Sequence, residues 1–491
     1  FEESYDIVPY RRMGIAGRAS YTYDNRYIAE FNFGYNGSEN FAKGYRFGFF
    51  PSVAIGYLLS EEKFMEPYKD TFSKIKFRGS FGLTGNDQLD GRRFAYQTTL
   101  GEDGTGYDWG TNGQYYHRNS RFEGDFGIPN LTWETVSKTN AGFELGLWNM
   151  IDFQVDYFFE HRYNIFMKRN NIPTSAGFRN TPWANYGKVN NQGIDLALNV
   201  NKQINKDLYV GFRGSFTYAQ NKIIEQDEAL GVMGTNRQRT GEKVNQLFGL
   251  VDEGLFTFDD FQKDANGDYL IAENGGYVVN EDIPTHTFGP VRPGDIKYKD
   301  VNGDGIINAS DEVAIGATTK PNLIYGFGIS AQWKGFDFNA HFQGAGKSSF
   351  FINGSTVYAF KDSQWGNILT NLVKDRYVDA ETAATLGIPA NENPNASYPR
   401  LSYGGNDNNY RASTYWLRDG SYLRLKTLEV GYTLPKSIVN KMRFNKIRVF
   451  FIGTNILTFA KFKEWDPEMG VSNGEKYPLA KTFTLGLTVN I

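Results

Sequence analysis

A twelve-residue segment rich in oxygen-bearing side chains, from 300 to 311, is the part of this chain best suited to chemistry. An EF-hand-type calcium loop takes side-chain oxygens from positions 1, 3 and 5, a backbone carbonyl from position 7 and further oxygens from positions 9 and 12. Position 6 is glycine, which allows the sharp turn, and here it is Gly305. The candidate ligands in this order are Asp300, Asn302, Asp304, Ile306 (through its carbonyl), Asn308 and Asp311. The segment therefore predicts a cation site.

Position 12 departs from the usual pattern, because Asp311 stands where a bidentate glutamate is expected. The neighbouring Glu312 offers a further oxygen. The alternative is a turn of Asn, Asp and Gly residues stabilised by its own side chains. We expect Ca²⁺ in a structural role, and prefer it to Mg²⁺ because many protein oxygens are offered. A similar segment, 264 to 268, is followed by Tyr269 where glycine is needed, so we expect a plain turn there.

Residues suited to catalysis are not arranged in a pattern that supports a reaction. The four histidines lack the spacing of zinc ligands, and neither a Gly-x-Ser-x-Gly motif nor a phosphate-binding loop is present. Neighbouring carboxylates such as Asp259 and Asp260 are typical of solvated turns rather than of a glycosidase pair. We therefore do not expect an enzyme.

Aromatic side chains between the predicted strands are better candidates for ligand contact. Flat rings stack on sugar faces and on peptide side chains. The candidates are Trp109, Trp183, Tyr358, Trp365 and Tyr410. Packing of loops against one another explains them equally well, and we single out Trp365 alone as a substrate contact.

The elements that must position these residues are β-strands with one apolar and one polar face. From Phe483 to Ile491 every second residue is large and apolar, while Thr, Gly and Asn fill the alternate positions. The segments 323 to 333 and 336 to 342 repeat this pattern on either side of a turn at Lys334 and Gly335. Successive side chains of a strand point to opposite faces. Such an apolar face is buried against a second sheet in a soluble sandwich, or faces lipid in a transmembrane barrel.

Strand length favours the barrel. Many of the predicted strands exceed the ~5 to 6 residues usual in soluble proteins and reach the ~9 to 11 needed to cross a bilayer. Alternation and turn residues predict thirteen of them, at 12 to 23, 27 to 38, 45 to 59, 74 to 85, 136 to 148, 151 to 163, 186 to 202, 207 to 221, 321 to 333, 336 to 346, 420 to 434, 447 to 458 and 481 to 491.

The connections alternate between short and long, as in outer-membrane barrels with short periplasmic turns and long external loops. The long ones are 86 to 135, 164 to 185, 222 to 320, 347 to 419 and 459 to 480. This pattern places the candidate cation loop in a long extracellular loop, 222 to 320. Apolar residues switch from odd to even positions between Leu425 and Leu428, and they occupy both from 447 to 457. These breaks in the alternation predict β-bulges.

Composition agrees with one continuous β architecture. The 491 residues include 16% aromatic residues and 54 glycines, and no composition shift marks a linker. The mean hydropathy is -0.49, and the longest apolar stretch, 47 to 59, is interrupted, so no transmembrane helix is expected. A net charge of -3 argues against a nucleic-acid partner, and the absence of cysteine excludes a disulfide framework. The chain begins at Phe1 without a signal-like segment, so we expect residues upstream.

Six segments together resemble one known family. They are KIKFRGSFGLTGND at 74 to 87, NLTWETVSKTNAGFELGL at 130 to 147, PGDIKYKDVNGDGIINASDEVAIG at 293 to 316, WLRDGSYLRLKTLEVGYTLP at 416 to 435, IRVFFIGTNILTFAKFKEWDPEM at 447 to 469 and YPLAKTFTLGLTVNI at 477 to 491. In sequence and order they are similar to the SusC/RagA family of TonB-linked outer-membrane transporters of Bacteroidetes-type bacteria. The resemblance implies that residues 1 to 491 are the C-terminal part of a 22-stranded transmembrane antiparallel β-barrel, about its last thirteen strands, without the plug and TonB box.

The same resemblance implies active import across the bacterial cell outer membrane. The expected cargo is oligosaccharide, with oligopeptide as the alternative. The expected partners are a SusD-like surface lipoprotein and the TonB complex, reached through the missing N-terminal part, with membrane lipid and lipopolysaccharide around the barrel. Two alternatives of other classes remain open, namely a passive porin and a soluble β-rich glycan-binding protein.

Overall fold

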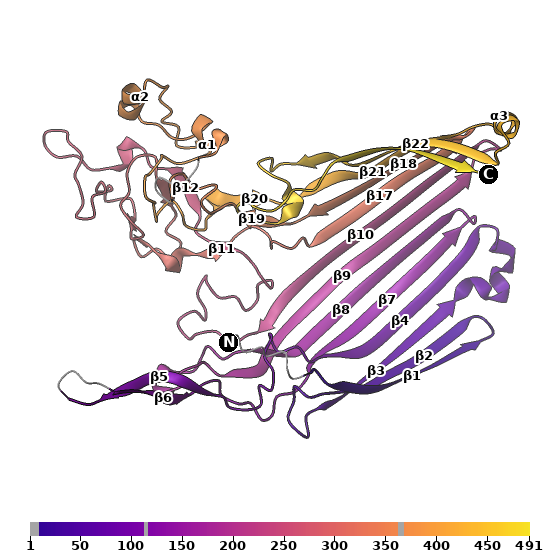
Figure 1. Ribbon diagram of the computed structural model, residues 1–491, viewed down its shortest axis with the longest axis horizontal. Helices are drawn as coiled ribbons and strands as arrows, with labels where there is room; N and C mark the ends of the chain where they lie inside the picture. Colours follow the sequence, from indigo (N-terminus) through magenta and orange to yellow (C-terminus); the bar gives the residue numbers. More distant parts are fainter. Residues whose placement is uncertain (1–8, 112–115, 362–367) are drawn as a thin grey trace. The chain divides into compact units, whose positions relative to one another are not determined.

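The computed structural model describes residues 9 to 111, 116 to 361 and 368 to 491 (Figure 1). Its main feature is an antiparallel sheet of thirteen strands, which confirms the predicted all-β class. The α-helices of the described part are short: α1 (Thr370–Lys374), α2 (Ala380–Leu386) and α3 (Lys436–Val439). None of the helices in these ranges has the length and apolar character needed to cross a membrane.

The chain divides into two compact units, each described by itself. The first comprises residues 1 to 203, 211 to 233 and 239 to 243, and the second comprises the remainder. In the first unit the strand order is β1 (Arg12–Tyr23), β2 (Tyr27–Ser38), β3 (Phe47–Leu58), β4 (Phe72–Asn86), β7 (Glu134–Leu147), β8 (Ile151–Lys168), β9 (Trp183–Gln203) and β10 (Leu208–Glu225), whose first three residues fall in the second unit. A separate hairpin pairs β5 (Leu100–Trp109) with β6 (Tyr116–Glu123).

In the second unit the order is β17 (Leu323–Trp333), β18 (Phe336–Gly346), β21 (Tyr422–Thr433), β22 (Lys446–Ala460) and β23 (Thr482–Asn490). All thirteen predicted strands are confirmed, and the largest error is at the end of β8, predicted at 163 and observed at 168. The long connection between β10 and β17 holds the segment predicted as an external loop, and its extracellular position stays a prediction.

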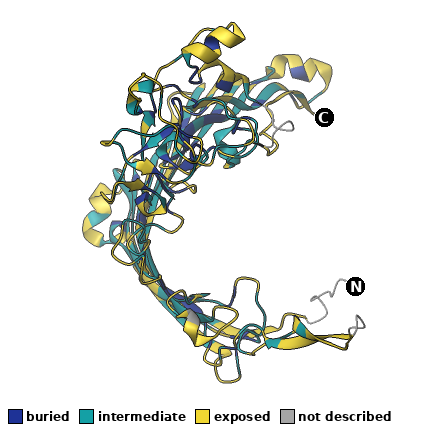
Figure 2. Cartoon of the chain, turned by 90° about the vertical axis from the view of Figure 1, so that its left-hand side faces the viewer, coloured by how far each residue is buried: buried dark blue, intermediate teal, exposed yellow. Residues whose placement is uncertain are grey.

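The apolar faces of the strands are uncovered. Leu485 on β23 is 81% exposed, and Ile55 on β3 is 69% exposed. The register places Ile55 beside Ala29 on β2 and Gly79 on β4, so these residues share one face. The strands are mostly intermediate or exposed in Figure 2. Within the described ranges no second sheet covers these faces, so the structure favours a lipid-facing sheet over a sandwich.

The predicted bulges are present where the apolar parity changes. On β18, His341 pairs with Thr427 and the next residue pairs with Leu425, so Lys426 is an extra residue on β21. On β22 the register shifts again, and Asn455 adopts a left-handed backbone with φ 53°. An extra residue reverses the side-chain alternation beyond it. The bulge therefore explains why Leu425 and Leu428 lie on the same face.

The loops of the second unit have a hydrophobic core of their own, which we call the loop core. It includes Ile296, Tyr298, Ile307, Tyr377 and Trp416, each at most 2% exposed. Short pairings such as β12 (Asp252–Leu255) with β14 (Ile296–Tyr298), and β19 (Ser349–Phe351) with β20 (Leu417–Asp419), surround it. In Figure 1, β12, β19, β20, α1 and α2 lie at the end of β17 to β22 opposite α3.

Candidate functional site

The segment predicted to bind a cation folds as a tight turn. The Asp300 carboxylate accepts hydrogen bonds from the backbone N–H groups of Gly303 (2.7 Å) and Gly305 (2.8 Å). The Gly305 N–H is the main reason that the pKa of Asp300 lies below its usual value. Both glycines have positive φ, 76° and 79°, which the turn requires. Asn302 Oδ1 accepts from Asp304 N, and Asp304 Oδ1 accepts from Ile306 N.

The second half of the segment closes onto the first. Asp311, fully buried, accepts hydrogen bonds from Val301 N (3.0 Å) and Asn308 N (2.9 Å). The structure thus gathers the predicted ligands into one turn, with their side-chain oxygens accepting from backbone N–H groups. Among the described residues, no three carboxylate or imidazole groups lie close enough together to hold a metal ion. The similar segment at 264 to 268 folds as an Asx turn, with Asp264 accepting from Asn266 N and Asp268 N.

The turn is joined to a buried histidine. β13 (Thr285–His286) pairs in parallel with β15 (Ile306–Ile307) inside the turn. His286 Nδ1 lies 2.8 Å from Asn408 Oδ1, while the Asn408 amide nitrogen donates to the Ile296 carbonyl and so fixes the amide orientation. Nδ1 is therefore the protonated nitrogen. Burial lowers the pKa of His286 to about 4, so the ring is neutral near pH 7.

The predicted substrate contact, Trp365, lies outside the described residues. Two of the other aromatic candidates belong to the packing of the loops, because Tyr358 and Tyr410 stack with ring centroids 4.2 Å apart beside the loop core. In the first unit, Trp183 stacks on Phe166, whereas Trp109 is 60% exposed. Of these four side chains, only Trp109 is mostly exposed.

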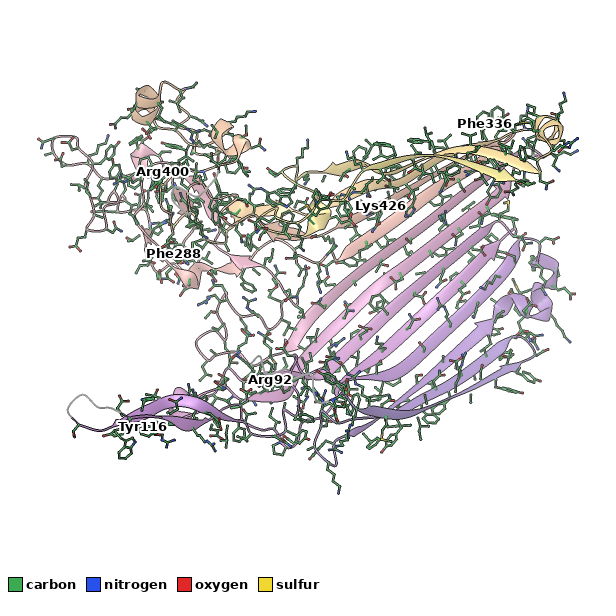
Figure 3. The ribbon with its side chains drawn as sticks, in the orientation of Figure 1. Arg92, Tyr116, Phe288, Phe336, Arg400 and Lys426 are labelled. Atoms are coloured by element: carbon green, nitrogen blue, oxygen red, sulfur yellow. The ribbon has the colours of Figure 1, made fainter. Side chains whose placement is uncertain are left out.

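A buried carboxylate ties the long loops of the second unit together. Asp295, fully buried, is paired with the Arg400 guanidinium at 2.8 Å and 3.0 Å. It also accepts hydrogen bonds from the side-chain amides of Asn406 (2.9 Å) and Asn409 (2.8 Å). Figure 3 places Arg400 among the loops, at the opposite end of the second unit from Phe336, the first residue of β18. These bonds fix the geometry of the loop surface.

Three loops of the second unit enclose a polar pocket that the sequence did not reveal. Its volume is about 710 Å³. Asp252 comes from β12, Lys374 and Asp375 from the end of α1, Arg418 from β20, and Glu464 from the connection after β22. Asn371, Ser397, Tyr398, Thr414 and Tyr415 complete the lining. We call it the charge pocket. No local motif marks it, because its members come from distant parts of the chain.

The chain matches the family model described as TonB dependent receptor-like, beta-barrel, over residues 3 to 305. The chain belongs to this family. Its localisation is accordingly the bacterial outer membrane, and the predicted class of protein is confirmed.

Curated relatives and solved structures agree with this assignment. The chain is 28% identical to TonB-dependent receptor P26 of Formosa agariphila, over 96% of this chain and 45% of that protein. It is 24% identical to TonB-dependent receptor SusC of Bacteroides thetaiotaomicron, over 96% and 43%. The RagAB peptide transporter structure matches with a TM-score of 0.70 and 21% identity, over 98% of this chain and 48% of that chain. The chain thus spans less than half the length of these relatives.

Proposed function

We propose that this chain supplies the strands and external loops of an active outer-membrane importer. The observation that carries the proposal is the pairing of long strands, whose apolar faces are uncovered, with ordered loops that have their own core. The uncovered faces suit lipid. The loops suit capture of a solute, since they position polar groups on a fixed frame.

The importer works with TonB and with a SusD-like surface lipoprotein, and its cargo is an oligosaccharide or an oligopeptide. Support comes from the family assignment and from relatives named as TonB-dependent receptors. On the polar face of β18, β21 and β22, Arg448 is paired with Asp337 and Glu429, and such charged groups suit the passage of a polar solute.

The decisive experiment measures uptake of labelled oligosaccharides and oligopeptides by cells that express the whole protein or lack it. An active importer loses uptake when a protonophore collapses the proton gradient. A passive porin keeps it, and that result would overturn the proposal. Detergent extraction of outer membranes, followed by affinity purification, should bring down a surface lipoprotein. Incubation of the purified protein with oligosaccharide should release no new reducing ends.

We propose separately that the segment 300 to 311 binds Ca²⁺ as a structural ion. Its support is the order of oxygen donors and the tight turn at Gly303 and Gly305. Binding requires the carboxylates of Asp300 and Asp304 to exchange backbone N–H partners for the ion. The affinity for Ca²⁺ therefore depends on the free energy of rearranging the turn.

Protease resistance of the loops tests the calcium site. Adding Ca²⁺ should slow cleavage within 222 to 320 in the wild type and have no such effect on Asp300→Asn. The matched variant is Asp264→Asn, in the similar turn that has Tyr269 where a calcium loop needs glycine. It should respond as the wild type does. If Asp300→Asn and the wild type responded equally to Ca²⁺, the proposal of a calcium site at 300 to 311 would be contradicted.

A further inference from the structure

The charge pocket holds five acidic or basic side chains that have no ion-pair partner in the described part of the protein. Asp252, Asp375 and Glu464 are carboxylates, and Lys374 and Arg418 are cations; none of the five lies within 4.0 Å of an opposite charge among the described residues. Two buried charged groups of the same unit are paired by contrast, since Asp295 lies against Arg400 and Arg424 lies against Asp466. The pocket therefore gathers five charges that a ligand can pair.

Several of these groups are held in place by bonds that leave their charged atoms available. Arg418 Nη1 donates to the carbonyls of Tyr415 (2.8 Å) and Leu417 (3.1 Å). Its remaining nitrogens can meet a carboxylate as a fork. Asp375 accepts a hydrogen bond from the Ser397 hydroxyl, and Asp252 accepts one from the Thr414 hydroxyl. Each carboxylate keeps further lone pairs for a ligand.

The tyrosine side chains supply an apolar boundary to the pocket. Tyr398 is buried in the loop core, and the Tyr415 hydroxyl donates to the Ala396 carbonyl at 2.8 Å. The ring of Tyr415 packs against Trp416 with centroids 5.2 Å apart. The rings therefore fix the shape of the pocket, while the charged groups select what enters it.

From this arrangement we propose that the charge pocket binds the termini of a short peptide: Arg418 takes a carboxylate, and Asp252, Asp375 and Glu464 take an ammonium group. Three carboxylates and two cations give the pocket a charge of -1, which favours a peptide of net positive charge. A neutral oligosaccharide would leave all five charges without a counter-charge. The inference rests on the proposed function and names oligopeptide as its substrate class.

The test uses the whole protein in detergent and three defined probes. The first is a lysine-containing tripeptide with free ends, the second is the same tripeptide acetylated and amidated, and the third is maltotriose. Calorimetry should show binding of the free tripeptide and at least ~10-fold weaker binding of the blocked one, because charge-assisted hydrogen bonds are lost. Maltotriose should not bind.

Two substitutions locate the binding site. Arg418→Gln should weaken the free tripeptide ~10-fold, and Arg418→Lys should cause a smaller loss, because it keeps the charge without the fork. The matched control is Arg411→Gln, which is exposed and lies over the Phe288 ring outside the pocket. It should bind as the wild type does. Unchanged chymotryptic patterns of the loops check that the variants are folded, because chymotrypsin does not cleave after the substituted arginines.

Three results would overturn the inference. They are failure of the free tripeptide to bind, equal binding of free and blocked tripeptides, and an Arg418→Gln variant with wild-type affinity. None of them contradicts active import, because protonophore-sensitive uptake is measured independently. Uptake that continued in the presence of a protonophore would instead contradict the proposed function. Peptide binding by the charge pocket would not be affected by that result.

Discussion

The sheet and the loops of the second unit bury their apolar residues in opposite ways. On β23, Leu485 and Leu487 are 81% and 64% exposed. In the loops, Ile296, Tyr298 and Ile307 are fully buried. Apolar side chains are therefore placed differently in the two regions. Those of the strands face hydrocarbon, whereas those of the loops are buried away from water in a core of their own.

The polar face of the sheet and the charge pocket also differ in how their charges are paired. On the polar face of the sheet, Arg448 is paired with Asp337 and Glu429, and the buried Arg424 is paired with Asp466 and Glu468. The charge pocket of the loops leaves its charges unpaired. Paired charges stabilise the sheet, whereas unpaired charges on a fixed loop frame are available to a solute.

The largest effect is expected in the loop core, from Trp416→Ala. Trp416 is 1% exposed, packs against Tyr358 at 5.2 Å between centroids, and donates its indole N–H to the Asn409 carbonyl at 2.6 Å. Removing a buried tryptophan costs about 3 to 5 kcal/mol of loop stability. Trypsin should therefore cleave the loops at lower temperature, while the heat-modifiable gel mobility of the barrel stays unchanged.

Trp109→Ala is the matched control, because Trp109 is 60% exposed and outside the loop core. It should leave the cleavage temperature as in the wild type. If Trp416→Ala lowered the gel-mobility transition by as much as the cleavage temperature, the loops and the sheet would unfold as one body and the comparison would fail.

The sheet supplies the next effect, from Leu485→Arg. A cation on the lipid face near the middle of a bilayer costs about 2 to 4 kcal/mol. The control is Thr484→Arg on the opposite face of the same strand, where water replaces lipid and the cost should be small. Urea unfolding in lipid vesicles measures both. Equal losses would show that the apolar face does not meet hydrocarbon.

The strands of the sheet could be predicted well from the sequence. Lipid on one face and water on the other require apolar and polar residues to alternate along each strand. Residues such as Leu485 and Thr484 reveal their faces by position alone, and the parity change near Leu425 revealed the bulge at Lys426. Alternation is a local signal that requires no knowledge of distant contacts.

The loops were not predictable in this way. Asp295 and Arg400 are 105 residues apart, and Asp252 and Thr414 are 162 residues apart. Pairings of two or three residues, such as β13 with β15, carry no periodic pattern. The turn at 300 to 311 was found because its donors lie within one segment, whereas the charge pocket is assembled from three loops and so leaves no such trace.

A smaller effect concerns His286 in the loops. Its pKa falls from 6.5 to about 4 on burial, so the unfolded chain binds a proton more readily than the folded loops. The stability gained from the neutral ring is complete above pH 6.5 and is lost as the pH falls toward 4. At pH 5.5 the loss is about 1 kcal/mol.

Thermal proteolysis of the loops between pH 7 and pH 5 measures this loss. His286→Gln keeps a donor for Asn408 without a titrating ring, so its stability should depend less on pH. His117→Gln, at an exposed position, should retain the wild-type dependence. A wild-type profile for His286→Gln would assign the pH effect to other groups.

The smallest effect is expected at the surface of the hairpin formed by β5 and β6. Arg121 and Glu102 form an ion pair at 3.0 Å, but each side chain is 74% exposed. Water and salt screen such a pair, so a double-mutant cycle with Arg121→Gln and Glu102→Gln should give a coupling of about 0 to 0.5 kcal/mol that disappears in 0.5 M salt. A coupling above about 1 kcal/mol would exceed what an exposed pair contributes, and would mean that this ion pair orders the hairpin in spite of solvent screening.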